Sequence, residues 1–125
     1  MRVLLDTHFL LWSLGSPGKL PAKARKVIQT SNAFVSAASI WEIAIKSALG
    51  KLKADPLEIV AAVGPAGLDF LPISALHAAS VAVLPSIHRD PFDRMLIAQA
   101  LSENMVLLTN DSMLRGYGPC VMISI

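Results

Sequence analysis

The sequence predicts an α/β fold in which helices cover both faces of a mainly parallel sheet. Three observations predict this fold: short apolar runs alternate with helical segments, capping or helix-breaking residues bound most helices, and no repeat or linker interrupts the order. Such alternation indicates right-handed crossovers between parallel strands. The chain has 125 residues, a length expected for one domain, which we assign to residues 1–125.

Five short apolar runs are predicted to be strands. The first run begins at Met1 and briefly resembles a signal peptide, but Asp6 and His8 interrupt it and no cleavage site follows. We therefore interpret it as a buried strand that ends at Asp6. The predicted strands are residues 3–5, 33–35, 68–71, 105–108 and 121–123, the last at an edge of the sheet.

Helices are predicted between these strands. Gly15 and Gly50 are expected to stop two of them, and the Asp-Pro pairs at residues 55–56 and 90–91 have the N-cap and first-turn residues of a helix start. Leu84-Pro85 breaks another helix. The predicted helices are residues 7–14, 21–29, from Ser36 or Ser39 to 49, from 56 to the Gly-rich segment 64–67, 74–83 and 91–104.

The composition excludes several classes of protein. The chain is 54% hydrophobic and 16% charged, which excludes intrinsic disorder and leaves fewer charges than the usual ~25%. With so few charges, the folded chain is expected to leave apolar surface uncovered, which suggests an oligomer or a protein partner. The net charge of +2 is too small to indicate nucleic-acid binding by itself. No apolar run is long enough for a membrane span, and the lone Cys120 favours a reducing compartment, the cytoplasm.

Four acidic residues are expected to meet at one edge of the sheet. Asp6 directly follows the first predicted strand. Asp111 lies two residues after Thr109, just past the end of the fourth. Ligands of open α/β sheets bind at the carboxyl ends of the strands. Glu42 and Asp93 lie early in helices that begin near the same edge, each in an apolar context.

A cluster of carboxylates needs a cation. Like charges at short range raise one another's pKa or push the structure apart. Mg²⁺ and Mn²⁺ prefer oxygen ligands, and a bound ion acidifies water and polarises a phosphate oxygen. The pattern therefore points to metal-assisted hydrolysis of a phosphodiester.

Each acid also has a structural interpretation. Asp90 is a good N-cap for the helix at Pro91, and Asp93 could complete a capping-box-like start. Glu42 can pair with Lys46 four residues on, and Asp111 can serve as a turn residue. The functional interpretation rests on the coincidence of all four acids at one edge.

Four ordered segments resemble a known family. They are residues 3–8 (Val-Leu-Leu-Asp-Thr-His), 39–43 (Ser-Ile-Trp-Glu-Ile), 90–100 (Asp-Pro-Phe-Asp-Arg-Met-Leu-Ile-Ala-Gln-Ala) and 107–111 (Leu-Leu-Thr-Asn-Asp). Together they resemble a PIN domain, and more closely a VapC-type toxin of a bacterial type II toxin–antitoxin pair. The resemblance implies a PIN-like three-layer α/β/α sandwich. It also implies a Mg²⁺- or Mn²⁺-dependent endoribonuclease, acting usually on transfer or ribosomal RNA, that forms a homodimer and is inhibited by a cognate antitoxin.

The resemblance also assigns residue roles. It implies that Asp6 and Asp93 are the most direct metal ligands, and that Glu42 and Asp111 hold waters or a second ion; Asp93 is chosen over Asp90 because it directly precedes the Arg-Met-Leu-Ile-Ala run. Residues expected to support the ligands by hydrogen bonds are Thr7, Ser36, Asp90, Thr109 and Asn110. Cations expected to hold RNA are Lys46, Arg94 and Arg115, with Lys51, Lys53 and Arg89 as further candidates.

Other readings stay open or are excluded. A catalytically idle PIN-like binding module and a housekeeping RNA-processing PIN nuclease remain, although the absence of an extra domain favours the toxin. A haloacid-dehalogenase-like phosphatase would need an acid at the position of His8. A receiver domain, a Rossmann binder and a P-loop protein lack their motifs here. The three histidines lack zinc-ligand spacing.

Overall fold

The fold is built on five parallel strands in the order β3-β2-β1-β4-β5, so β1 lies in the middle. The computed structural model describes residues 1–125. Its strands are β1 (Arg2–Leu5), β2 (Asn32–Ser36), β3 (Asp69–Leu71), β4 (Val106–Thr109) and β5 (Val121–Ile123). Its helices are α1 (Thr7–Gly15), α2 (Ala22–Thr30), α3 (Ala37–Ala48), α4 (Pro56–Val63), α5 (Ala75–Ser80) and α6 (Pro91–Glu103), with 3₁₀ turns η1 (Pro17–Lys19), η2 (Val81–Val83) and η3 (Ser112–Tyr117).

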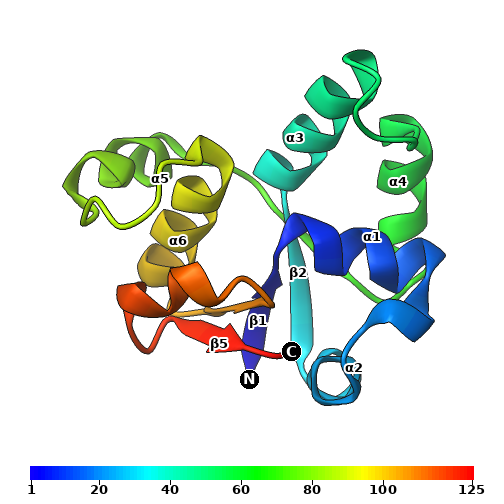
Figure 1. The fold of residues 1–125 in the computed structure, drawn as a ribbon, viewed down its shortest axis with the longest axis horizontal. Helices are drawn as coiled ribbons and strands as arrows, with labels where there is room; N and C mark the ends of the chain where they lie inside the picture. Colours follow the sequence, from blue (N-terminus) through cyan, green and yellow to red (C-terminus); the bar gives the residue numbers. More distant parts are fainter.

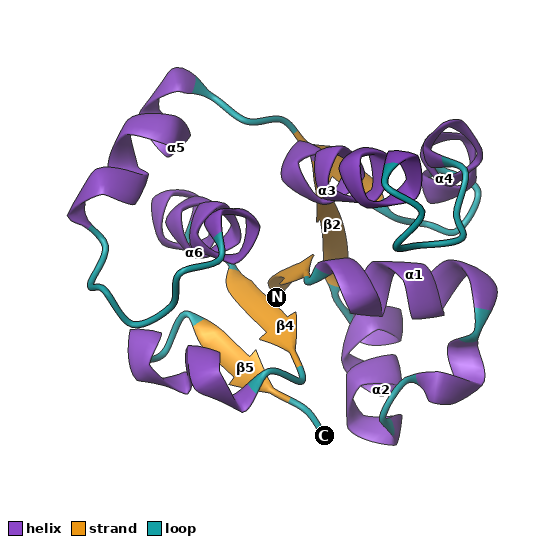
Figure 2. Cartoon of the chain, turned by 45° about the horizontal axis from the view of Figure 1, so that its top comes forward, coloured by secondary structure: helices purple, strands orange, loops and turns teal.

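Every pair of neighbouring strands is parallel, which confirms the predicted sheet and its edge strand β5. Figure 2 shows the arrowheads of β4 and β5 pointing the same way. Leu5 of β1 is in register with Leu108 of β4. The residues that follow them therefore leave the sheet side by side, at its carboxyl edge.

Helices cover both faces of the sheet, as predicted. In β1, Val3 and Leu5 pack with α1 to α4, whereas Leu4 points to the opposite face and packs with α6. This alternation follows from the two-residue period of a strand. Figure 1 shows the two helical groups, α1 to α4 on one side and α5 with α6 on the other. All three β1 residues are fully buried, which explains why the run is continuously apolar.

Polar side chains start three helices, two of them directly at strand ends and the third after a loop. Asp6, Ser36 and Asp90 are the N-caps of α1, α3 and α6, and each accepts a backbone N–H from the first turn. Ser36, not Ser39, therefore caps α3. At the other end of α6, Asn104 takes a left-handed conformation with φ of 53° and ends the helix.

The structure differs from the prediction in small ways. Gly15 is the last residue of α1 rather than its stop, and β3 begins at Asp69. The helix predicted over residues 74–83 tightens to a 3₁₀ turn from Val81 onward. Residues 112–117 form η3, where the sequence has no apolar period to predict a helix.

Candidate active site

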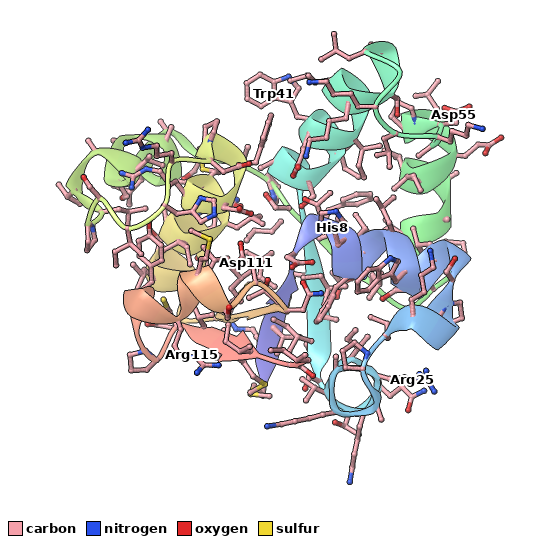
Figure 3. All side chains as sticks on the ribbon, in the orientation of Figure 1. His8, Arg25, Trp41, Asp55, Asp111 and Arg115 are labelled. Atoms are coloured by element: carbon pink, nitrogen blue, oxygen red, sulfur yellow. The ribbon has the colours of Figure 1, made fainter.

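A cavity of about 350 Å³ lies at the carboxyl edge of the sheet, and no hydrophobic residue lines it. All four predicted acids line it. The complete set is Asp6, Thr7, His8, Glu42, Lys46, Asp90, Asp93, Thr109, Asn110 and Asp111. We call this cavity the acid pocket. Figure 3 labels His8 and Asp111, which flank it from α1 and from the loop after β4.

Asp6 is fixed in the pocket by two hydrogen bonds. Its Oδ1 accepts the backbone N–H of Phe9 at 2.7 Å, and its Oδ2 accepts the hydroxyl of Thr109 at 2.5 Å. The pKa of Asp6 is nonetheless raised, because burial penalises its charged form more than the two hydrogen bonds favour it. This carboxylate is therefore held in one orientation, and burial makes its negative charge costly.

Glu42 reaches the pocket from the buried side of α3. Its Oε1 accepts the hydroxyl of Thr7 at 2.7 Å, and its Oε2 lies 2.5 Å from Nζ of Lys46. The hydrogen bond to Glu42 raises the pKa of Lys46, which holds the ammonium charged. Glu42 therefore forms the predicted pair with Lys46 and also lines the pocket beside the other acids.

Asp93 is the acid of the site whose pKa is raised to about 7. Its carboxylate accepts no hydrogen bond, while Oδ1 of neighbouring Asp90 accepts the N–H groups of Phe92 and Asp93. Burial, and then the charge of Asp90, raise the pKa of Asp93 to about 7. Asp90 thus has the predicted N-cap role, and Asp93 is the acid left free at the pocket.

His88 is a neighbour of the acids that the sequence did not reveal. Its Nε2 lies 3.4 Å from Oδ2 of Asp111 and 3.7 Å from Oδ2 of Asp93. Its Nδ1 accepts the backbone N–H of Asp90 at 3.0 Å, so a neutral ring carries its proton on Nε2, toward the two acids. His88 lies in an aperiodic loop, and its only signal was its place two residues before Asp90.

The other predicted site residues divide between the pocket and its surroundings. Thr7, Asp90, Thr109 and Asn110 line the pocket, whereas Ser36 lies outside it, caps α3 and donates to Oε1 of Gln99 at 2.5 Å. These are the positions found for the residues expected to support the acids.

The predicted cations also divide. Lys46 lines the pocket, and Arg115 is exposed on η3. Arg94 instead turns toward the loop before α6, where it donates to the carbonyl oxygens of Val81 and Pro85, both at 3.0 Å. These contacts give Arg94 a role in holding that loop.

The residues of the pocket fit a divalent cation. Five acids and one lysine give the lining a formal charge of −4 when all are ionised. The donors are hard oxygens, and burial raises the pKa of Asp6 and of Asp93, so a cation bound beside them would offset the cost of their negative charge. Mg²⁺ and Mn²⁺ prefer such donors.

The charge of the chain is divided between the pocket and the rest of the surface. Of the 11 Lys and Arg and 9 Asp and Glu residues, the pocket holds one lysine and five acids. The remaining ten cations and four acids leave +6 outside it. The small net charge of the sequence conceals this separation, which suits a polyanion bound around a cation-filled pocket.

Comparison with known protein families adds to this geometry. The sequence model described as PIN domain matches residues 3–118, nearly the whole chain. The chain belongs to the PIN domain family. PIN domains are nucleases that generally use divalent metals, which agrees with the oxygen-lined pocket and supports a hydrolase acting on phosphodiester bonds. No curated protein matches the sequence.

Solved structures share the fold of this PIN domain at low sequence identity. VapBC2 from Rickettsia felis, bound to a promoter DNA fragment, matches with a TM-score of 0.68 and 14% identity over 99% of this chain and 98% of that chain. DNA-bound VapBC from Salmonella typhimurium matches with a TM-score of 0.67 and 21% identity, over 99% of this chain and 97% of that chain. FitAcB from Neisseria gonorrhoeae matches with a TM-score of 0.63 and 18% identity, over 96% of each chain. No helix of this PIN domain has the length and apolarity that crossing a membrane requires.

Proposed function

We propose that this PIN domain is a Mg²⁺- or Mn²⁺-dependent endoribonuclease and the toxin of a toxin–antitoxin pair. The observation that carries the proposal is the acid pocket: Asp6, Glu42, Asp93 and Asp111, which come from four distant parts of the chain, line one cavity without a hydrophobic residue. A pocket of this charge at the carboxyl edge of the sheet is suited to a metal ion and a phosphate.

Asp6 and Asp93 would hold the ion, with Glu42 and Asp111 placed to hold its waters or a second ion. A bound divalent cation would make a water more acidic and polarise a phosphate oxygen. Thr109 keeps the carboxylate of Asp6 turned to the pocket, and Thr7 does the same for Glu42. Lys46, already beside Glu42, offers positive charge to the phosphate.

Loss and return of the metal test the nuclease. We expect EDTA to abolish cleavage of RNA by the purified protein and added Mn²⁺ or Mg²⁺ to restore it. Asp6→Asn and Asp93→Asn should remove cleavage while circular dichroism stays unchanged. Cleavage that survives in both variants would overturn the assignment, and a folded protein that cleaves no RNA would favour an idle binding module.

The toxin role is supported by the structures that share the fold, several of which are named as toxin–antitoxin or VapBC complexes. We propose a small antitoxin protein as partner and transfer or ribosomal RNA as substrate. Induced expression should arrest growth, and co-expression of the adjacent small gene should relieve the arrest. A housekeeping nuclease would instead be tolerated without that gene.

We also propose a homodimer that acts in the cytoplasm. Trp41 is 62% exposed and packs edge-on against Phe92 with ring centroids 5.5 Å apart, and Leu49, the C-cap residue of α3, is 63% exposed. Large exposed apolar side chains favour contact with another protein surface. Cys120 is a free thiol, in agreement with a reducing compartment. Light scattering on the purified protein tests the dimer.

A further inference from the structure

The acid pocket adjoins a longer cleft along α1. A cavity of about 270 Å³ between α1 and α3 shares Thr7, His8, Glu42 and Lys46 with the acid pocket and adds Lys51. A third cavity, of about 490 Å³, continues from it between α1 and α4, and His8 lines all three. We call the second and third cavities together the α1 cleft. Figure 3 labels His8 at the start of α1, below α3 in this view.

The α1 cleft has a rim of lysines. Lys46 and Lys51 border its inner part, and Lys53 and Lys19 border its outer part. Lys19, Lys51 and Lys53 are exposed and take part in no ion pair. The acids of the outer part are Asp55, which caps α4, and Glu58. With Glu42, which pairs with Lys46 in the inner part, the α1 cleft has four lysines and three acids along a path that begins at the site of the proposed reaction.

The floor of the α1 cleft is apolar and includes an aromatic ring. Leu11, Leu52 and Ile59 line it, together with Trp12, whose ring is tilted by 49° to His8 at 6.1 Å between centroids. Single-stranded nucleic acids bind where cations follow the backbone and aromatic rings stack the bases. The α1 cleft combines both features, and α1 is about 13 Å long, room for a few nucleotides.

We infer that the α1 cleft holds the RNA strand on one side of the cleaved phosphate, with Lys51 and Lys53 on its backbone and Trp12 under a base. The inference rests on the proposed nuclease function and adds to it the path of the substrate. Continuity with the acid pocket favours RNA here over a protein segment, because a strand whose phosphate enters the pocket must leave it through an adjoining opening.

The experiment measures binding without cleavage. In an Asp93→Asn background with Mg²⁺, fluorescence anisotropy follows a short fluorescein-labelled single-stranded RNA of random sequence. The double variant Lys51→Glu/Lys53→Glu should weaken binding at least about tenfold and flatten the log–log salt slope by about 1.4, the value for two lost phosphate contacts on a single strand. The matched double variant Lys23→Glu/Lys26→Glu makes the same charge change on α2, outside the α1 cleft, and should weaken binding by less than about threefold.

Trp12 is tested by a conservative pair. Trp12→Leu should weaken RNA binding at least about fivefold, and Trp12→Phe, which keeps a stacking ring, should restore most of it. Thermal unfolding of each variant checks that the fold is kept. Equal effects of the two double lysine variants on RNA binding would overturn the inference. So would a Lys51→Glu/Lys53→Glu variant that binds RNA normally but no longer binds the antitoxin. If the wild type cleaves RNA and the cleft variants cleave it with the same KM, the inference about the α1 cleft is wrong but the proposed nuclease function stands. If the wild type binds no RNA at all, the proposed function is wrong as well.

Discussion

Thr109 donates its hydroxyl to Oδ2 of Asp6 at 2.5 Å, across the junction of β1 and β4. The hydroxyl oxygen of Thr109 in turn accepts the backbone N–H of Asp111 at 3.1 Å. One hydroxyl thus links two acids that are 105 positions apart in the sequence. The link exists because Leu5 and Leu108 are in parallel register, which brings the next residues of both strands together.

Removal of this hydroxyl should loosen the metal site. We expect Thr109→Val to weaken Mn²⁺ binding about 10–100-fold, the usual effect of losing a hydrogen-bonding neighbour of a ligand. Thr109→Ser keeps the donor and should retain most of the affinity. Titration calorimetry with Mn²⁺ measures both, and equal affinities of the valine and serine variants would show that the hydroxyl does not position Asp6.

Catalysis should depend on acids of the pocket and not on acids in general. Asp93→Asn should lower the rate of RNA cleavage at least about 100-fold if the metal is held there. Asp69→Asn removes an exposed acid at the start of β3, outside the pocket, and should leave the rate within about twofold. A denaturing gel with Mn²⁺ present compares the two rates. Similar losses in both variants would speak against a localised site.

The raised pKa of Asp93 predicts a pH-dependent stability of the metal-free protein. Because this pKa is about 7 in the folded state and near 3.8 in the unfolded state, the folded state binds the proton more tightly. The contribution of Asp93 to stability is therefore present below pH 4 and is lost as the pH rises from about 4 to 7.

Asp93→Asn mimics the neutral acid and should be more stable than the wild type at pH 8 by about 1–3 kcal/mol without metal. The difference should shrink toward zero near pH 4. Thermal unfolding in EDTA across this range measures it. A wild type as stable as the variant at pH 8 would mean that the charge of Asp93 is already compensated.

Arg94 should affect the stability of the fold more than RNA binding. It donates to the carbonyl oxygens of Val81, Pro85 and His88, so it ties the loop that carries His88 to α6. Arg94→Ala should lower the free energy of unfolding by about 1–3 kcal/mol, whereas Arg115→Ala, at an exposed position, should change it by less than about 0.5 kcal/mol. An unchanged melting temperature for Arg94→Ala, with weakened RNA binding, would restore the role first assigned to it.

The sequence predicted the parts of the site that local rules control. A continuous apolar run indicated that β1 is buried, so Asp6 had to lie at its end. The Asp-Pro pair marked the start of α6, which put Asp93 in its first turn. These features depend on a few neighbouring residues, and the parallel sheet then brings the ends together.

What the sequence could not predict depends on side-chain direction in aperiodic segments. His88 reaches Asp111 only because its loop folds back over Tyr117, whose hydroxyl accepts the N–H of His88 at 3.1 Å. The inward turn of Arg94 depends on the same loop. Trp41 is 62% exposed, which the sequence could not predict, since the spacing of apolar residues on α3 does not tell which of them lie outside the core.

The central claim is that the acid pocket binds a divalent cation, and calorimetric titration of Mn²⁺ into the metal-free protein tests it most directly. At pH 7 the wild type should bind the ion and release roughly half a proton per ion, because Asp93, with a pKa of about 7, must ionise. Asp6→Asn/Asp93→Asn should bind weakly and release none. Wild-type binding no tighter than that of the double variant would contradict the claim.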